Sequence, residues 1–258
     1  MNELKFIGII PARYASTRFP GKPLAMLGGI TVIERVYRQV SLVLDNVVVA
    51  TDDERIAQAV AAFGGKAVMT STEHRSGTDR CREAYLSNGG EEDVIINIQG
   101  DEPFIQPGQI KAIMSCFDDA ATDIATIIRP FAPTRPVTEL LNPNSPKVVV
   151  DRKMNAVYFS RSVIPYLRNI EENKWPESHR FYTHIGMYAY RADVLDRITR
   201  LPQSPLEVAE SLEQLRWLEN GFIIKTAESD IETVGIDTPE DLERAAKILE
   251  TKKNVNND

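Results

Sequence analysis

Short apolar runs alternate with amphipathic helical patterns from the start of the chain to about residue 130. The runs "KFIGII" at 5–10, "NVVVAT" at 46–51 and "DVIINIQ" at 93–99 have continuously apolar centres, which is typical of strands buried on both faces. Between the first two, "TVIERVYRQVSLVL" at 31–44 spaces its apolar residues as one face of a helix does. Because the connections are short, this alternation predicts an α/β fold with a mostly parallel twisted sheet flanked by helices.

The pattern changes between residues 132 and 191, where prolines are more frequent and strand signals follow one another. The segment at 147–161, "KVVVDRKMNAVYFSR", predicts a hairpin with its turn at 151–155, and "FYTHIGMYAYR" at 181–191 predicts a long strand. We therefore expect a single domain over 1–258 that contains an inserted β-rich lobe at 132–191. Further predicted elements are a helical segment at 204–221 ending at Gly221, strands at 222–227 and 232–236, and a helix after Thr238 as N-cap.

The charge and the cysteine content narrow the class of protein. The net charge is −7, and this acidic balance argues against a general nucleic-acid or membrane-surface binding protein. The two cysteines, Cys81 and Cys116, form no C-x-x-C motif, which suits a reducing compartment without structural disulfides. The sequence shows no signal-peptide pattern and no apolar run of about 18 residues, so we expect a cytoplasmic protein that does not span a membrane.

Three cations gather in one loop of this acidic chain. The stretch "IIPARYASTRFPGKPL" at 9–24 follows the first predicted strand and contains Arg13, Arg18 and Lys22. In an α/β sheet, ligands bind beyond the carboxyl ends of the strands, and several cations there suit a polyphosphate. The alternative is that these are solvated loop charges. The loop is neither a P-loop nor a dinucleotide-binding fingerprint, because the sequence has neither G-x-x-x-x-G-K-[ST] nor G-x-G-x-x-G there.

Two acidic residues follow predicted strands. Asp101 comes after "VIINIQ" in "QGDEP", and Asp237 comes after "ETVGI". A folded sheet can bring such strand ends together, and Mg²⁺ prefers one or two carboxylates with phosphate oxygens and water. Each has a plainer interpretation: Asp237 assists the helix cap at Thr238, and Asp101 is a turn residue. The pair Asp52-Asp53 is expected to cap a helix.

Several segments carry a family resemblance, in order and over almost the entire chain. The segments are "HRSGTDR" at 74–80, "NIQGDEP" at 97–103, "NPNSPKVVVD" at 142–151, "YFSR" at 158–161, "HIGMYAYR" at 184–191, "PLEVAESLEQLRWLENG" at 205–221 and "GIDTPEDLERA" at 235–245. Together with the 9–24 loop they resemble the 3-deoxy-manno-octulosonate cytidylyltransferase (CMP-Kdo synthetase) family. Sialic-acid cytidylyltransferases typically read P-A-R-x-G-S-K in this loop, whereas this chain has "YASTR" at 14–18, which favours the Kdo branch.

The resemblance implies a nucleotide-diphospho-sugar transferase-like fold and the reaction CTP + Kdo → CMP-Kdo + pyrophosphate with Mg²⁺, which activates Kdo for lipopolysaccharide biosynthesis. Arg13 and Lys22 would hold the triphosphate and stabilise the leaving pyrophosphate. Ser16 and Arg18 would assist them. The metal ligands would be Asp101, which also belongs to the nucleotide site, and Asp237. Such a transfer needs no covalent enzyme intermediate, so catalysis rests on positioning and charge neutralisation.

By the same resemblance, the cytosine base would bind near the main chain of Ala12 and the segment that holds Ser76, Gly77 and Arg80. Gly77 would let the backbone approach the base. Ser76 or Thr78 also suits a helix N-cap, and both roles can coexist. The sugar acid would bind Gln99, Arg161, His184, Tyr188, Glu213 and Gln214, with Arg161 suited to its carboxylate. His184 has a structural alternative as a buried histidine, and Glu213 or Gln214 has an alternative as a solvent-facing residue.

Two rival functions stay open at the level of sequence. One is a cytidylyltransferase for another acidic sugar, such as sialic acid or 8-amino-Kdo. The other is a non-catalytic nucleotide-binding module, which would have lost Asp101, Asp237 or Lys22, yet all three are present. The expected partners are CTP and an acidic eight-carbon sugar, without nucleic acid or membrane. The resemblance also implies a homodimer formed through the 132–191 lobe.

Overall fold

The computed structural model describes residues 4–231 and 234–255, the side chains as far as residue 251. The chain forms two compact units. Unit 1 comprises residues 1–110 and 232–258, and unit 2 comprises residues 111–231. No helix within the described ranges is long and apolar enough to cross a membrane.

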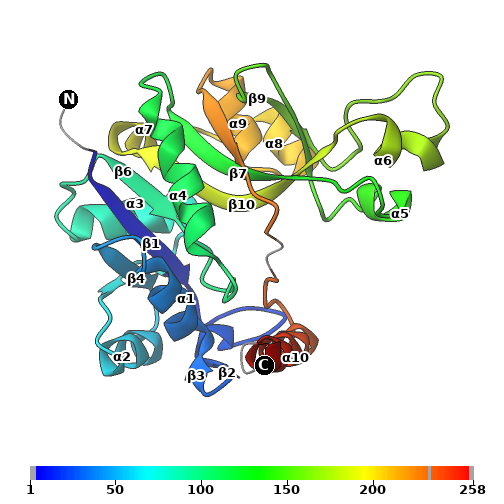
Figure 1. Ribbon diagram of the computed structural model, residues 1–258. Helices are drawn as coiled ribbons and strands as arrows, with labels where there is room; N and C mark the ends of the chain where they lie inside the picture. Colours follow the sequence, from blue (N-terminus) through cyan, green and yellow to red (C-terminus); the bar gives the residue numbers. More distant parts are fainter. Residues whose placement is uncertain (1–3, 232–233, 256–258) are drawn as a thin grey trace. The chain divides into compact units, whose positions relative to one another are not determined.

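Unit 1 is built on four parallel strands (Figure 1). Strand β1 (Phe6–Ala12) pairs with β6 (Val94–Asn97) on one side and β4 (Val47–Thr51) on the other, and β4 pairs with β5 (Ala67–Met69). The apolar centres of β1, β4 and β6 are buried, as their continuous hydrophobic runs predict. This arrangement confirms the α/β fold with a mostly parallel sheet.

The helices of unit 1 begin at side-chain caps. Thr31, Asp53 and Ser76 accept main-chain hydrogen bonds at the starts of α1 (Val32–Val40), α2 (Glu54–Ala62) and α3 (Gly77–Ser87). Asp53 is therefore the cap of α2, whereas Asp52, also expected to cap, has another role described below. The remaining elements here are η1 (Lys22–Leu24), β2 (Met26–Leu27), β3 (Ile30–Thr31), α4 (Pro107–Ser115), which continues into unit 2, and α10 (Pro239–Val255).

Unit 2 has a mixed sheet. Strand β7 (Ile124–Pro130) runs parallel to β11 (Ile224–Glu228) and antiparallel to β10 (Tyr182–Arg191). Strands β8 (Lys147–Val150) and β9 (Ala156–Ser160) form the predicted hairpin, and β8 also pairs with β10. The short helices are η2 (Cys116–Asp118), α5 (Val137–Leu140), η3 (Glu172–Lys174), α6 (Trp175–Ser178), α7 (Ala192–Ile198), α8 (Pro205–Glu210) and α9 (Gln214–Glu219).

Two expectations about the C-terminal third differ from the structure. The helical segment at 204–221 is broken into α8 and α9, because Ser211 adopts a left-handed conformation with φ 51°. The strand expected at 232–236 is not found in its described part, residues 234–236, while residues 232–233 lie outside the described residues. The segment 132–191 lies inside unit 2, whose sheet also includes β7 and β11; its role as an inserted dimerisation lobe stays a prediction.

Candidate active site

The cationic loop is folded back on Tyr14. Gly21 has φ 73°, and its N–H donates a 2.9 Å hydrogen bond to the carbonyl of Tyr14. A Cβ on Gly21 would lie 3.0 Å from the Tyr14 ring, so both the backbone and the packing require glycine here. The guanidinium of Arg55 also lies over the Tyr14 ring, 3.3 Å from its centroid, and Asp53 holds that guanidinium. The loop that carries Arg13, Arg18 and Lys22 is thus fixed by its own sequence.

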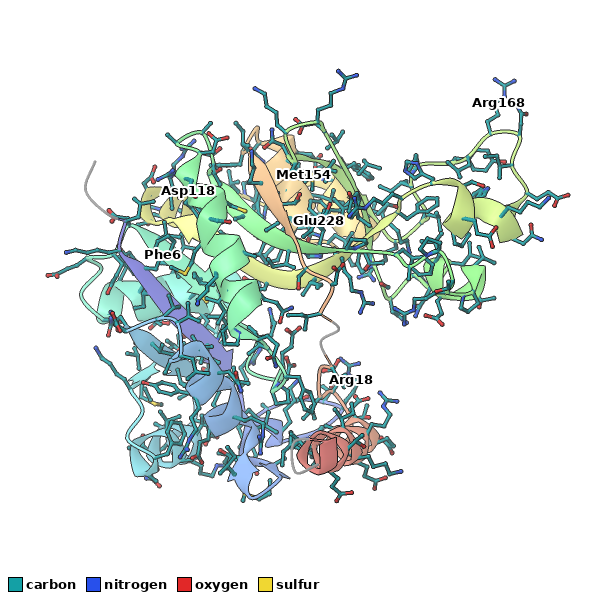
Figure 2. The ribbon with its side chains drawn as sticks, in the orientation of Figure 1. Phe6, Arg18, Asp118, Met154, Arg168 and Glu228 are labelled. Atoms are coloured by element: carbon teal, nitrogen blue, oxygen red, sulfur yellow. The ribbon has the colours of Figure 1, made fainter. Side chains whose placement is uncertain are left out.

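Lys22 lies between the two carboxylates that the sequence singles out. Its Nζ contacts Oδ2 of Asp101 and lies 3.0 Å from Oδ1 of Asp237. The other oxygen of Asp237 lies 3.0 Å from Nη2 of Arg18, whose exposed side chain lies near α10 (Figure 2). Burial alone would lower the pKa of Lys22, but the carboxylates of Asp101 and Asp237 offset it and the net pKa is raised. The ammonium therefore stays charged.

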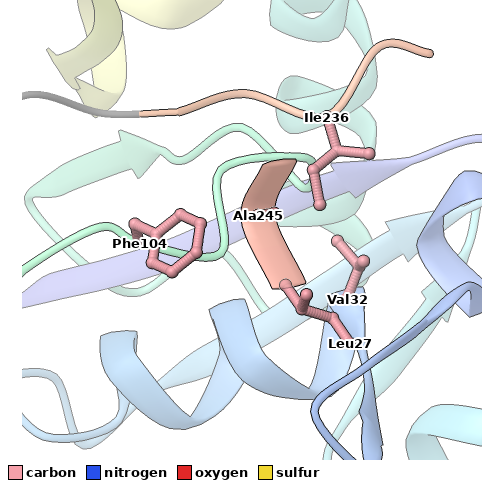
Figure 3. Close-up of a cluster of buried hydrophobic side chains, with 5 residues drawn as sticks. All are labelled: Leu27, Val32, Phe104, Ile236 and Ala245. Carbon is pink, nitrogen blue, oxygen red and sulfur yellow. The ribbon is translucent and has the colours of Figure 1, made fainter. Parts of the chain in front are cut away.

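A hydrophobic cluster brings these three segments together (Figure 3). Leu27 and Val32 follow the Lys22 segment, Phe104 follows Asp101, and Ile236 precedes Asp237. These side chains and Ala245 of α10 are buried against one another. The N–H of Ile236 also donates a 2.8 Å hydrogen bond to the carbonyl of Asp101. Apolar burial and one main-chain hydrogen bond thus bring the two carboxylates together. Asp237 is positioned in this way and not, as the sequence suggested, by the end of a strand.

A close backbone approach fixes the turn that holds Asp101. A Cβ on Gly100 would lie 2.6 Å from the carbonyl oxygen of Pro11, at the carboxyl end of β1. Only glycine allows this contact. The N–H of Glu102 donates to the carbonyl of Gln99 at 3.2 Å, so Asp101 is a turn residue and a partner of Lys22 at once. Gln99, an expected sugar ligand, is half-buried in this turn.

The helix cap beside Asp237 is made by other side chains. Thr238 Oγ1 accepts a 3.3 Å hydrogen bond from the N–H of Asp241. Oδ2 of Asp241 in turn accepts from the N–H groups of Asp237 and Thr238 at 3.0 and 2.9 Å. The carboxylate of Asp237 is directed to Lys22 and Arg18 instead. The cap interpretation of Asp237 is therefore not needed to explain its position.

A second charge cluster joins Arg13 and Arg80 through Asp52. Oδ2 of Asp52 lies 2.8 Å from Nη2 of Arg80 and 3.5 Å from Nε of Arg13. Arg80 is 1% exposed and also contacts Thr70 Oγ1, so its guanidinium holds the end of β4. The sequence predicted a helix cap for Asp52, and its pairing with Arg80 and Arg13 was not expected. The available signal was its position directly after a buried strand, the same kind of position as that of Asp101.

The segment expected to bind the base combines a helix cap with an open glycine. Ser76 Oγ accepts a 3.1 Å hydrogen bond from the N–H of Asp79, which confirms the N-cap interpretation. Gly77 is exposed, and a Cβ there would meet only Asn97 and Pro11 at an ordinary 3.8 Å. Packing within unit 1 therefore does not require glycine at this position, and close approach of a ligand is a reason for it. Ala12 is buried at the end of β1, and Ser16 is half-buried with its N–H bonded to the carbonyl of Tyr14.

In unit 2, Arg161 is bound to main-chain carbonyl groups. Its Nε donates to Glu210 at 2.6 Å, and its Nη2 donates to Ser211 at 3.1 Å. Its Nη1 donates to Pro143 at 3.0 Å. The side chain thus holds the left-handed turn at Ser211, while each Nη keeps a second N–H. Arg161 can bind a carboxylate only with these remaining donors.

Two further charged side chains lie close to Arg161: the half-buried Glu210 binds it, and the buried Lys147 holds the neighbouring 142–145 segment. The carboxylate of Glu210 accepts from Ser160 Oγ at 2.7 Å and from the Arg161 N–H at 2.9 Å. Lys147 is fully buried, and its Nζ donates to the carbonyls of Asn142 and Ser145 at 2.9 and 2.8 Å. No local sequence signal marks these contacts, because they join segments that are distant or irregular.

His184 is a neutral histidine with a defined tautomer. The hydroxyl of Thr126 lies 2.8 Å from the carbonyl of Met187, which can only accept, so the hydroxyl donates there. It must then accept from Nε2 of His184 at 2.9 Å, which leaves Nδ1 as the acceptor of the ring. Burial lowers the pKa of His184 to about 3. The ring packs edge-to-face against Phe159, so His184 has the structural role of a packed histidine. This packing leaves Nδ1 available to a hydroxyl donor.

The remaining expected sugar ligands lie near the aromatic rings of β10 and α9. Tyr188 packs against His184 and Trp217, and burial raises its pKa well above the usual value. Gln214 is 3% exposed, and its Nε2 has no hydrogen-bond partner among the residues described. Glu213 is half-buried beside Arg216 at 2.8 Å. Neither Glu213 nor Gln214 is a freely solvated residue, and the unpartnered amide nitrogen of Gln214 suits donation to a hydroxyl group.

The carboxylate pair suits a divalent cation that brings or finds other oxygen ligands. Both carboxylates reach one ammonium, so both can reach one metal ion. In residues 4–231 and 234–255 no group of three or more His, Cys, Asp or Glu side chains could hold a metal. Asp101 and Asp237 therefore fit Mg²⁺ together with phosphate oxygens, and they do not form a complete all-protein site.

Known proteins resemble this chain over nearly its full length. A family model described as cytidylyltransferase matches residues 7–232. Relatives named 3-deoxy-manno-octulosonate cytidylyltransferase are 64% identical in Phocaeicola vulgatus (97% of this chain, 99% of the relative) and 62% identical in Bacteroides thetaiotaomicron (96% and 100%). A structure of CMP:2-keto-3-deoxy-manno-octonic acid synthetase complexed with CTP is 44% identical with a TM-score of 0.87, covering 96% of this chain and 99% of that chain. A 4-diphosphocytidyl-2C-methyl-D-erythritol synthase from Anaerococcus prevotii, 14% identical with a TM-score of 0.57 over 95% and 99%, shows the fold alone.

The fold and these relatives together define a nucleotidyltransferase enzyme. A cationic loop and two converging carboxylates lie beyond the ends of parallel strands, the edge at which open α/β sheets bind their ligands. With relatives 62–64% identical over nearly its full length, the chain belongs to the 3-deoxy-manno-octulosonate cytidylyltransferase family. The family resemblance found in the sequence is thereby confirmed.

Proposed function

We propose that the protein transfers CMP from CTP to 3-deoxy-D-manno-octulosonate, giving CMP-Kdo and pyrophosphate and activating the sugar for lipopolysaccharide biosynthesis. The observation that carries the proposal is Lys22 held between Asp101 and Asp237. This trio places a cation for phosphate and two carboxylates for a metal at one point. Family membership supplies the identity of the nucleotide and of the sugar.

The chain contributes positioning and charge rather than a covalent intermediate. The anomeric hydroxyl of the sugar attacks the α-phosphorus of CTP, and pyrophosphate leaves. Lys22 and Arg13 bind the triphosphate and stabilise the charge that grows on pyrophosphate, with Arg18 and Ser16 assisting. The clamp of Arg55 on Tyr14 and the left-handed turn at Gly21 keep these groups in place.

Mg²⁺ is the proposed cofactor, with Asp101 and Asp237 as its protein ligands. When bound, it would offset the charge of two anionic substrates and favour the attacking form of the sugar hydroxyl. Asp101 is held by the main chain at Gly100 and Ile236, so its carboxylate needs little rearrangement. The role of Asp237 follows from its approach to the same ammonium.

The substrate-binding residues divide by chemistry. For cytosine we propose the main chain at Ala12 and Gly77 together with the side chains of Ser76 and Arg80. Arg80 also binds Asp52 and Thr70, so it orders this part of the site in addition to contacting the base. For the sugar we propose Gln99, Arg161, His184, Tyr188, Glu213 and Gln214. The neutral His184 with Nδ1 as acceptor, and the unpartnered amide nitrogen of Gln214, support recognition of hydroxyl groups.

Location and assembly are part of the proposal. We propose a cytoplasmic homodimer formed through the 132–191 segment. Free thiols at Cys81 and Cys116 support a reducing compartment, and exposed apolar side chains at Val157 and Tyr166 support an interface. Sedimentation equilibrium of wild type and of a Val157→Lys/Tyr166→Lys variant tests the dimer, and a wild-type monomer would contradict it.

Pyrophosphate release with a panel of nucleotides and sugar acids tests the activity. CTP with Kdo should give the highest kcat/KM, and UTP or GTP should give much less. Sialic acid and 8-amino-Kdo are the informative competitors, because they distinguish Kdo from the other acidic sugars. Equal turnover with UTP would contradict the nucleotide assignment, and a preference for sialic acid would contradict the sugar assignment.

A further inference from the structure

We propose that the Lys22 ammonium stands in for a divalent cation between Asp101 and Asp237 until nucleotide arrives, so that this chain binds its metal only together with CTP. The inference rests on the proposed function, because it assumes that these carboxylates bind the metal. It adds a binding order and a second role for Lys22. In the free enzyme Lys22 excludes the metal, and in the complex the same side chain binds phosphate.

The Lys22 ammonium occupies the place between the two carboxylates where a divalent cation is expected. Lys22 Nζ contacts Asp101 Oδ2 and lies 3.0 Å from Asp237 Oδ1, so it occupies the point on which both carboxylates converge. Two carboxylates so close repel each other unless a cation lies between them. The Lys22 side chain is only 16% exposed, whereas the Arg18 side chain is 66% exposed and contacts only Oδ2 of Asp237. Lys22 is therefore the central cation of the cluster and Arg18 a peripheral one.

A metal ion alone has little to gain from this site. It would have to displace an ammonium that is already paired with both carboxylates. It would then find two protein carboxylates, since the described residues hold no larger cluster of metal-binding side chains. Mg²⁺ loses its water reluctantly and normally combines one or two carboxylates with phosphate oxygens. The free enzyme should therefore bind a divalent cation weakly.

The triphosphate changes this balance. The lysine ammonium sits on a flexible four-carbon stem, so it can turn from the carboxylates to a phosphate without movement of the main chain. The two carboxylates are then open to a metal that the phosphate oxygens also bind. CTP and metal should thus favour each other's binding, and thermodynamic linkage requires the effect to be equal in both directions.

Manganese binding without nucleotide tests the exclusion directly. Free Mn²⁺ is measured by electron paramagnetic resonance in titrations of wild type, Lys22→Gln, Arg18→Gln and Lys225→Gln. Lys225 is the matched control, because it is 18% exposed and pairs with Asp119 at 3.3 Å in unit 2. We expect Lys22→Gln to bind Mn²⁺ at least tenfold more tightly than wild type. The Mn²⁺ affinity of Arg18→Gln should rise less than threefold, and that of Lys225→Gln should equal the wild-type value.

The outcomes separate the inference from the function on which it rests. The increase in Mn²⁺ affinity of Lys22→Gln should vanish in Lys22→Gln/Asp101→Asn, because the double variant lacks the carboxylate that the loss of Lys22 makes available. Equal Mn²⁺ affinity in wild type and Lys22→Gln overturns the exclusion, as does an equal gain in Arg18→Gln, which would indicate general electrostatics. If Asp101→Asn and Asp237→Asn retain Mn²⁺ in the CTP complex as wild type does, the metal assignment itself fails.

Wild-type enzyme provides a test that does not depend on the folding of any variant. Calorimetric titration of Mn²⁺ into enzyme alone, CTP alone and their mixture gives the coupling. We expect the protein to tighten Mn²⁺ binding to CTP at least tenfold, with weaker binding to enzyme alone. If enzyme alone binds Mn²⁺ as tightly as the mixture does, Lys22 excludes nothing.

Discussion

The N–H of Ile236 donates a hydrogen bond to the carbonyl of Asp101, and Ile236 immediately precedes Asp237. One main-chain bond thus ties together the two segments that carry the carboxylates. The same isoleucine is fully buried beside Phe104 and Leu27. The spacing of the carboxylates is therefore a property of the core of unit 1 and not of a bound ligand.

Ile236→Ala should lower both stability and turnover. Removal of a fully buried isoleucine side chain typically costs about 2–5 kcal/mol of unfolding free energy, depending on how far the site collapses. Asp237 should shift with it, so kcat should fall in protein that is still folded. Urea titration and pyrophosphate release provide the two measurements. Leu42→Ala is the control, because Leu42 is 68% exposed in the same unit, and its change should be about 0.5 kcal/mol or less.

Lys22→Ala should reduce kcat by about two orders of magnitude. A donor aimed at charge that develops in the transition state is worth ~3 kcal/mol, and Lys22 is the half-buried cation of the loop. Circular dichroism and thermal melting check that the variant is folded. A folded variant with a rate near that of wild type would place Lys22 among the solvated charges.

Arg161→Ala should raise the KM for the sugar much more than the KM for CTP. Two mechanisms give this result: loss of a donor to the sugar carboxylate, and loss of the support for the turn at Ser211. Glu210→Gln distinguishes them, because it weakens the same turn without removing the guanidinium. A sugar effect confined to Arg161→Ala favours direct contact, whereas equal effects in both variants favour support of the turn. A rise in the KM for CTP alone would contradict both.

Local patterns predicted most elements and the central charged residues. Continuous apolar runs gave β1, β4 and β6, and side chains at Asp53, Ser76 and Thr238 cap helices as their sequence positions indicate. The convergence of Asp101 and Asp237 was expected from strand ends. The structure instead positions Asp237 by apolar packing and a main-chain bond.

The features that the sequence did not reveal depend on contacts between distant residues. The break at Ser211 interrupts a stretch of good helix-forming residues, and its carbonyl is held by Arg161, which lies far away in sequence. The pairing of Asp52 with Arg80 likewise joins a strand end to a helix. Periodicity and capping rules describe neighbours along the chain, so they cannot report such pairs.

His184 should stay neutral at every pH at which the enzyme is folded and active. Its folded pKa of about 3 lies below the usual value of 6.5, so the unfolded chain binds the extra proton more readily between these values. Stability is thus unaffected by this group above about pH 6.5 and falls as the pH drops below it. Nitrogen-15 shifts of the ring should report the Nε2–H tautomer from pH 5 to 8. A titration near pH 6.5 would contradict the assignment.

Asp101→Asn and Asp237→Asn should each abolish Mg²⁺-dependent transfer while CTP binding persists. Either change removes one of two protein ligands, and the described residues provide no cluster that could replace it. The base and the triphosphate are bound mainly by other groups, so CTP affinity measured without a divalent cation should survive. Turnover measured against Mg²⁺ concentration, beside CTP affinity from calorimetry, gives both quantities. Asp53→Asn is the control, because Asp53 caps α2 and should leave the Mg²⁺ dependence unchanged. Normal turnover at low Mg²⁺ in either site variant would show that its carboxylate is not a metal ligand, and would leave that residue as a partner of Lys22.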